Sequence, residues 1–209
     1  MQFLAHRGHW QTPPERNTHA AFLRAWKGGY GIETDVRDRL GAPVIAHDPP
    51  DESAMGLPDF LRARIAHGRD TPLALNIKAD GLTADVQRLV ELTGAKHFFV
   101  FDMSVPDTLH YLRAGIPVFV RLSEYEPQSV LLDRAAGVWL DAFESEWWGP
   151  DMLRELTARD KRVAIVSPEL HRRPHQAVWR TIKDAEPAVK EKILLCTDFP
   201  DAAGQFFTS

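Results

Sequence analysis

Three short polar motifs in the first 48 residues combine the residue types that divalent-cation chemistry requires. Glu33 and Asp35 lie two residues apart in an apolar run, and residues two apart on a β-strand project from the same face. His6 and His47 end the neighbouring apolar runs, so a histidine follows the strand on each side of the carboxylates. Two carboxylates flanked by two imidazoles suit a divalent cation with a general acid and a general base. This pattern predicts a metal-dependent hydrolase.

The composition excludes several other classes of protein. The chain has 209 residues, and its formal net charge of −4 argues against broad nucleic-acid binding. No apolar run approaches the roughly 18 residues of a membrane span, and no basic segment followed by an apolar stretch opens the chain. We therefore expect a cytoplasmic protein without stable membrane insertion. Its single cysteine, Cys196, lies in an apolar run and is expected to be a buried core thiol.

Short apolar runs alternate with amphipathic segments along the whole chain, which is the pattern of repeated βα units. We expect strands at residues 2–6, 31–36, 43–47, 73–77, 97–101, 117–122, 137–140, 162–166 and 193–197. Helical patterns fall between most of them, at 83–92, 107–113, 151–158 and 176–192, the last interrupted by Pro187. A first helix follows the capping pair Asn17-Thr18 and ends at Gly28-Gly29.

The strand count favours a closed α/β barrel. The 43–47 run follows the 31–36 run through a tight turn at 39–42, so the two runs count as one extended unit. Eight strand positions then remain, which predicts a single (β/α)8 TIM barrel over residues 1–209. The alternative is an open doubly wound sheet, but no Gly-x-Gly-x-x-Gly turn follows any of the expected strands.

Further polar residues end the later strands, where a barrel gathers its catalytic groups. Asn76 and Lys78 end one run, two residues apart and therefore on one face. Three acids that follow later runs are interpreted as helix caps: Asp102, Asp141 and Asp198. The pair Arg172-Arg173 either binds a second anionic group or forms a solvated basic turn.

In several of these motifs the chain resembles the glycerophosphodiester phosphodiesterases, within the wider group of phosphatidylinositol-phospholipase-C-like barrels. The matching residues are His6-Arg7-Gly8, Glu15 with Asn17-Thr18, Ala21-Phe22 with Ala25, Glu33-x-Asp35, Pro43-Val44 through His47-Asp48, and Thr197-Asp198-x-Pro200. The first 48 residues carry the specific match, and the middle of the chain is similar mainly in architecture. One departure is Arg16, which separates Glu15 from Asn17 where the family writes Glu-Asn-Thr.

The resemblance implies a phosphoric diester hydrolase that acts on a glycerophosphodiester or a related alcohol or sugar phosphodiester. It implies that Glu33 and Asp35 hold a divalent cation and that His6 and His47 act as general acid and base. Hard oxygen ligands suit Mg²⁺ or Ca²⁺ better than Zn²⁺. The expected partner is accordingly a small-molecule phosphodiester, not a nucleic acid.

The resemblance also implies that Arg7 and Lys78 contact the phosphate, and that residue 76 is a third cation ligand. The family has an acid there, whereas this chain has Asn76, whose amide oxygen can ligate Mg²⁺ or Ca²⁺ but carries no charge. We therefore expect weaker cation binding, unless Asp80 or Asp102 supplies the missing carboxylate. The same change supports an alternative function, a barrel that binds a phosphorylated small molecule with little or no turnover.

Overall fold

The computed structural model describes residues 1–68 and 70–208, which fall into two compact units. The N-terminal unit comprises Leu4–Val118, and the C-terminal unit combines Met1–Phe3 with the chain from Phe119 onward. Every candidate metal, phosphate or acid–base residue named above belongs to the N-terminal unit. Arg69 and Ser209, which the expected 1–209 domain includes, lie outside the described residues.

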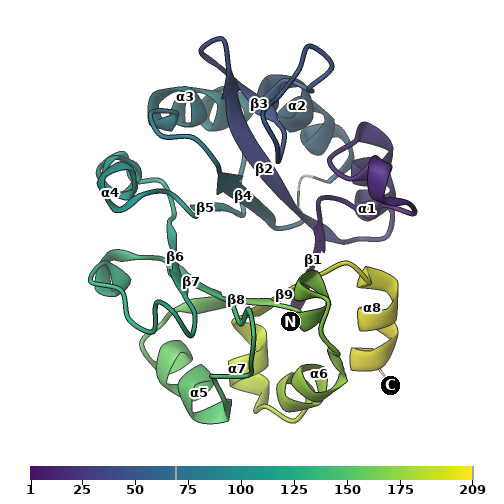
Figure 1. Ribbon diagram of the computed structural model, residues 1–209, viewed down its shortest axis with the longest axis vertical. Helices are drawn as coiled ribbons and strands as arrows, with labels where there is room; N and C mark the ends of the chain where they lie inside the picture. Colours follow the sequence, from purple (N-terminus) through teal and green to yellow (C-terminus); the bar gives the residue numbers. More distant parts are fainter. Residues whose placement is uncertain (69, 209) are drawn as a thin grey trace. The chain divides into compact units, whose positions relative to one another are not determined.

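The N-terminal unit is built on parallel strands with helices between them (Figure 1). Its strands are β1 (Gln2–His6), which belongs to this unit from Leu4 onward, β2 (Gly31–Arg39), β3 (Ala42–Ile45), β4 (Leu73–Ile77) and β5 (Phe98–Phe101). They follow the order β5-β4-β2-β1, and β3 pairs with β2 off this path. The helices are α1 (His19–Lys27), α2 (Leu57–His67), α3 (Thr83–Thr93) and α4 (Val105–Arg113). Each of these elements except α2, for which no range was predicted, lies within a few residues of its sequence-based expectation.

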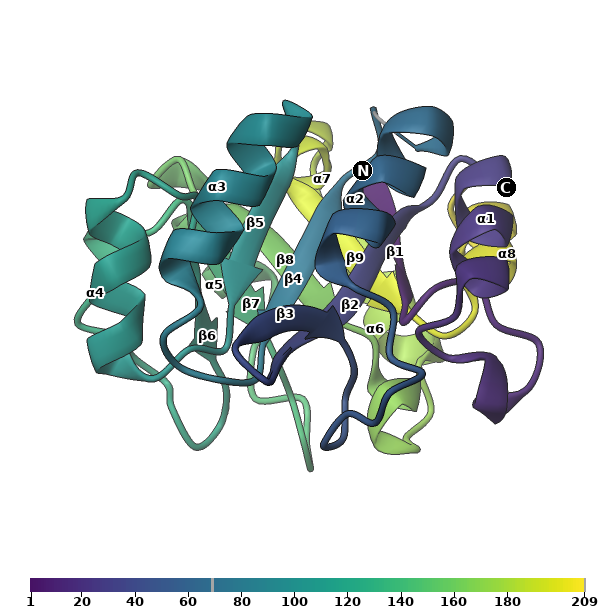
Figure 2. The same ribbon diagram turned by 90° about the horizontal axis from the view of Figure 1, so that it is seen from above.

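A tight hairpin joins β2 to β3, as the sequence predicts. Leu40 and Gly41 form its turn with φ values of 50° and 79°, and Arg39 pairs with Ala42 across it. Two consecutive residues with positive φ are typical of the turns whose twist matches a β-hairpin. Figure 2 shows this hairpin and the long loop that leads from β3 to α2. The hairpin places His47 two residues beyond the end of β3.

The parallel register around β2 brings the candidate residues of three strands into neighbouring positions. His6 of β1 pairs with Glu33 of β2, and Asp35 of β2 pairs with Asn76 of β4. The backbone N–H of Lys78 donates to the carbonyl oxygen of Val36 at 2.8 Å, which extends the β2–β4 ladder past the end of β4. Backbone pairing alone therefore gathers these side chains at one end of the strands.

The C-terminal unit repeats the same βα pattern. Its parallel strands are β6 (Phe119–Leu122), β7 (Gly137–Leu140), β8 (Arg162–Val166) and β9 (Ile193–Thr197), in the order β9-β8-β7-β6. Its helices are α5 (Pro150–Ala158), α6 (Gln176–Lys183), α7 (Pro187–Glu191) and α8 (Pro200–Thr208). The expected interruption at Pro187 separates α6 from α7. Cys196 is buried, as predicted, and no helix among the described residues has the length and apolarity to cross a bilayer.

Buried Arg64 connects α2 by hydrogen bonds to the segments that lead into β4 and β5. Its side chain is 1% exposed, and its Nη2 donates to the carbonyl oxygens of Thr71 and Lys96, both at 2.7 Å. Burial lowers the pKa of this guanidinium to about 10. Because one guanidinium donates to carbonyl oxygens of two segments that are distant in sequence, these two hydrogen bonds matter for the position of β4.

Replacement of this arginine, Arg64→Met, should lower the free energy of unfolding by about 2–4 kcal/mol, since two carbonyl acceptors lose their donor. Arg62 provides a matched control, because it is exposed on the same helix and pairs with Asp59 one turn away. We expect Arg62→Met to change stability by at most about 0.5 kcal/mol. Urea unfolding followed by circular dichroism measures both; equal midpoints for the two variants would contradict the role of Arg64.

Candidate active site

Two buried carboxylates on β2 form the centre of the site. Glu33 is 2% exposed and Asp35 is 1% exposed. Burial and the neighbouring charge of Asp35 raise the pKa of Glu33 to about 7. Removing two like charges from water costs free energy unless opposite charge or hydrogen-bond donors surround them. The surroundings of these carboxylates therefore indicate what the site is built to hold.

Three buried oxygen atoms in this centre have no hydrogen-bond partner among the described residues: Glu33 Oε2, Asp35 Oδ1 and Asn76 Oδ1. Buried polar atoms rarely lack a partner in folded proteins, and a bound ion is one way in which such atoms are satisfied. Two carboxylate oxygens and one amide oxygen are hard ligands of the kind that Mg²⁺ and Ca²⁺ prefer. The donor set thus fits the expected cation, although the described residues contain no metal-type cluster of three His, Cys, Asp or Glu side chains.

The second oxygen of Asp35 is held by two residues of the β1–α1 connection. Asn17 donates from Nδ2 to Asp35 Oδ2 at 3.0 Å, and Arg7 Nε lies 3.1 Å from the same oxygen as an ion pair. The amide oxygen of Asn17 in turn accepts a hydrogen bond from Thr34 Oγ1 at 2.8 Å. These contacts fix the rotation of the Asp35 carboxylate and direct Oδ1 away from them.

Asn17 is a site residue that the sequence reasoning missed. We expected it to share the capping of the first helix, but Thr18 is the N-cap of α1, and its side chain accepts from the Ala21 N–H. The sequence did contain a signal for this role. Asn17 and Thr18 are both good N-cap residues, but a helix needs only one N-cap, so the other is available for a different contact. Glu15, from the same motif, lies outside this contact network, since it accepts from the Gln11 N–H and pairs with Arg24.

The two histidines differ in their surroundings. His6 is largely buried, and its Nε2 lies 3.9 Å from Glu33 Oε2. His47 is 44% exposed, and its Nδ1 lies 2.9 Å from Asp48 Oδ1. A carboxylate on Nδ1 selects the tautomer and orients the ring, which leaves Nε2 as the nitrogen that can exchange a proton with a ligand.

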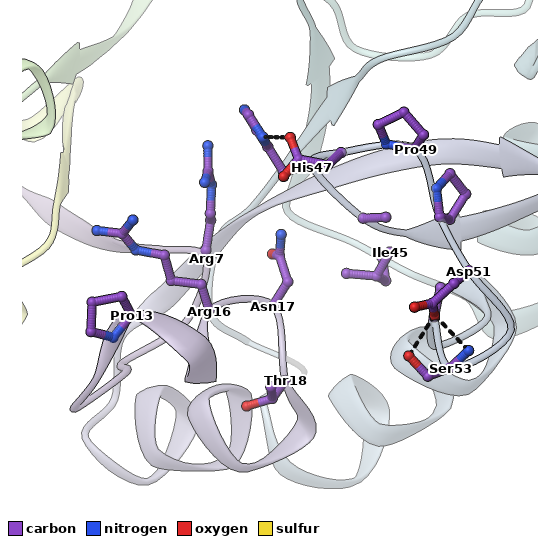
Figure 3. A pocket seen from close by; sticks show the side chains of 14 residues that line it. Arg7, Pro13, Arg16, Asn17, Thr18, Ile45, His47, Pro49, Asp51 and Ser53 are labelled. Carbon is purple, nitrogen blue, oxygen red and sulfur yellow. Dashed lines mark hydrogen bonds and ion pairs between the residues drawn. The ribbon is translucent and has the colours of Figure 1, made fainter.

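A pocket of about 490 Å³ opens beside these groups (Figure 3). Arg7, Asn17 and His47 line it, together with Arg16 and the loop that follows β3. In Figure 3 the side chains of Arg7, Asn17 and His47 extend toward the same open space. The volume is in the range of small-molecule sites, and a guanidinium beside an imidazole suits an anionic ligand.

Lys78 stands between two carboxylates. Its Nζ lies 3.8 Å from Asp35 Oδ1 and 3.7 Å from Asp102 Oδ2. The interpretation of Asp102 as a helix cap is wrong, because the N-cap of α4 is Ser104, whose Oγ accepts from the Asp107 N–H. The Ser104 hydroxyl accepts the hydrogen bond from the first turn of α4. The Asp102 carboxylate therefore does not cap this helix and contacts Lys78.

Two interpretations also change in the C-terminal unit. Asp141 is buried and does not cap α5, whose N-cap is Gly149; its Oδ1 lies 2.7 Å from His171 Nε2. Arg173 donates to the carbonyl oxygen of Ala142 and forms an ion pair with Glu146. These partners explain why Arg173 is folded against its own unit, and they argue against the first of its two alternatives, binding of a second anionic group.

Comparison at the level of sequence gives no match: no protein-family model matches the chain, and no curated protein sequence does. Solved structures do match. The glycerophosphodiester phosphodiesterase of Agrobacterium tumefaciens str. C58 is 17% identical, with a TM-score of 0.68 over 99% of this chain and 98% of that one. That of Thermotoga maritima is 15% identical, with a TM-score of 0.64 and 97% of each chain covered.

A Ca²⁺-dependent phosphatidylinositol-specific phospholipase C from Streptomyces antibioticus is similar as well. It is 10% identical, with a TM-score of 0.56 over 98% of this chain and 96% of that one. The chain therefore has the (β/α)8 TIM-barrel fold, as predicted. More particularly, it shares the fold of the glycerophosphodiester phosphodiesterases, and the resemblance read from its motifs is confirmed at the level of the fold.

Binding of a cation should compete with protonation of Glu33. Because the pKa of Glu33 is raised to about 7, a proton occupies this carboxyl at lower pH and must leave when a cation binds. We expect the Mg²⁺ affinity of the metal-stripped protein to be about tenfold lower at pH 6 than at pH 8. Isothermal titration calorimetry in buffers of different ionisation enthalpy measures both the affinity and the released proton.

The control for this experiment is Glu33→Gln, which should bind Mg²⁺ weakly at both pH values. Without cation, wild-type stability relative to this variant should fall as pH rises from 4.5 toward about 7, because the unfolded chain loses the Glu33 proton first. A wild-type Mg²⁺ affinity that is the same at pH 6 and pH 8 would contradict competition between a proton and a cation at Glu33.

Proposed function

We propose that this protein is a divalent-cation-dependent phosphodiester hydrolase that acts on a glycerophosphodiester or a related alcohol or sugar phosphodiester. The observation that carries the proposal is the set of three buried oxygens without hydrogen-bond partners, next to Arg7 and Lys78. The fold alone is not sufficient, because barrels with other activities also match this chain, an isomerase and a dihydropteroate synthase among them. The site residues and the shared fold point to the same reaction.

Glu33, Asp35 and the Asn76 amide oxygen would hold the cation. Mg²⁺ or Ca²⁺ in this place would neutralise charge on the non-bridging oxygens of the phosphate. The similar phospholipase C from Streptomyces antibioticus is Ca²⁺-dependent, which supports a hard cation for this chain. With an amide in place of a third carboxylate, the cation is held by two formal negative charges, so we expect modest affinity.

Arg7 and Lys78 are suited to bind the phosphate itself. Both are basic side chains beside Asp35, and both remain partly exposed, at 19% and 23%. The planar guanidinium of Arg7 can pair with two phosphate oxygens, while the lysine ammonium acts as a compact charge. Together they would place the phosphorus next to the carboxylate centre.

The two histidines would move the protons. One imidazole accepts the proton of the attacking hydroxyl, and the other donates a proton to the leaving alkoxide. His47 lines the pocket and is oriented by Asp48, whereas His6 lies next to Glu33. A pocket of about 490 Å³ supports a small-molecule substrate, and a cytoplasmic location stays an expectation from the sequence.

A second candidate function is binding of a phosphorylated small molecule without turnover. Asn76 favours it, because the loss of one carboxylate weakens the cation site that hydrolysis needs. The two functions separate when cation-stimulated turnover is measured beside the thermal shift produced by glycerol 3-phosphate. Stabilisation without turnover would select the binding protein.

Turnover of glycerophosphodiesters and of bis(p-nitrophenyl) phosphate should require added Mg²⁺ or Ca²⁺ and stop in excess chelator. Glu33→Gln and His47→Ala should each lower kcat/KM by about 100-fold or more, since one removes a cation ligand and the other a proton carrier. His110→Ala is the control, because His110 is exposed on α4, and its activity should equal that of the wild type. Wild-type rates in both site variants would refute the proposed hydrolase.

A further inference from the structure

Asp102 is an acid that neither the expected cation site nor the helix caps account for. We propose that Asp102 is a positioning residue, which holds the Lys78 ammonium ready for a phosphate group and away from the cation ligands. The inference rests on the proposed function, since it assigns Lys78 to the phosphate of a substrate. It assigns to Asp102 a role on the lysine, not on the cation.

The ammonium of Lys78 is shared almost equally between two carboxylates. Its distances of 3.8 Å to Asp35 Oδ1 and 3.7 Å to Asp102 Oδ2 are both ion-pair distances, and both exceed the length of a hydrogen bond. Asp35 Oδ1 is also one of the three buried oxygens available to a cation. If the ammonium moved into hydrogen-bond distance of Asp35 Oδ1, it would repel a cation bound to that oxygen. The Asp102 carboxylate attracts the ammonium from the other side, which leaves Asp35 Oδ1 available to a cation and Lys78 available to a phosphate.

The backbone at Asp102 supports this role. Asp102 is the first residue after β5, and its φ of 71° lies in the left-handed region that few non-glycine residues adopt. Such a conformation costs free energy and is retained where the surrounding structure requires it. Since β5 pairs with β4, with Phe101 opposite Asn76, the turn at Asp102 lies beside the end of the strand that leads to Lys78.

Asp80, the other acid considered as a replacement ligand, has a different partner. Its Oδ2 accepts a hydrogen bond from Ser104 Oγ at 2.9 Å, and the residue is exposed. Asp102, in contrast, is separated from Asp35 Oδ1 by the ammonium that both contact. The geometry therefore places the carboxylate of Asp102 against Lys78 and not among the expected cation ligands.

A double-mutant cycle on Asp102 and Lys78 tests the inference. Asp102→Asn removes the charge, and asparagine tolerates the left-handed backbone. With saturating Mg²⁺, we expect this variant to bind glycerol 3-phosphate about tenfold more weakly than the wild type. In the Lys78→Met background the same substitution should change that affinity by less than about twofold, because its effect acts through the lysine.

Asp80→Asn is the matched control, with the same loss of charge on the neighbouring turn, and should bind glycerol 3-phosphate like the wild type. Asp102→Gly, which relaxes the backbone and also removes the carboxylate, should reproduce Asp102→Asn. Thermal unfolding of each variant shows that the affinities are those of folded protein.

Two results would overturn the inference. An unchanged affinity in Asp102→Asn would show that Lys78 does not need Asp102. Equal losses in the wild-type and Lys78→Met backgrounds, with weaker Mg²⁺ binding in both, would make Asp102 a cation ligand instead. Binding is measured without turnover, so a wild-type protein that hydrolyses no diester would refute the proposed function while the cycle still decides the role of Asp102.

Discussion

Burial of two carboxylates on one face of β2 is the constraint on which the rest of the site depends. Charged groups taken out of water cost several kcal/mol unless they are paired, so the fold must supply compensation nearby. Asp35 obtains part of it from Asn17 and Arg7. Glu33 obtains less, which is why its pKa rises to about 7. The negative charge of these carboxylates that no neighbouring group compensates is the physical argument for a bound cation.

That constraint extends to the backbone of the surrounding loops. Arg7, Asn17 and Asp102 all have positive φ, at 56°, 59° and 71°, although none is a glycine. The first two are joined by a hydrogen bond from the Asn17 N–H to the Arg7 carbonyl oxygen, and both side chains contact Asp35. Strained conformations persist when the contacts they allow outweigh their cost. Here those contacts are the ones that position the charged groups of the site.

The features that could be predicted from sequence are the local ones. The alternation of Glu33 and Asp35 on one strand face follows from the two-residue period of a β-strand, and the hairpin after β2 follows from its turn residues. The partners of Asn17 and Asp102 depend instead on loop conformations and on strands that are distant in sequence. Capping propensity pointed to the nearest helix in both cases, but Thr18 and Ser104 cap those helices.

The combination of Asn76 with Asp102 changes where the negative charge of the site resides. An acid at position 76 would place a third carboxylate directly among the cation ligands. With Asn76 there, that carboxylate is missing, and the charge of Asp102 lies beside Lys78. Coulombic attraction weakens with distance, so a cation bound here would be held less strongly than by three carboxylates, while Lys78 has a carboxylate on each side. Under the proposed function, such a site would rely more on its basic side chains, and less on a cation, to hold a phosphate.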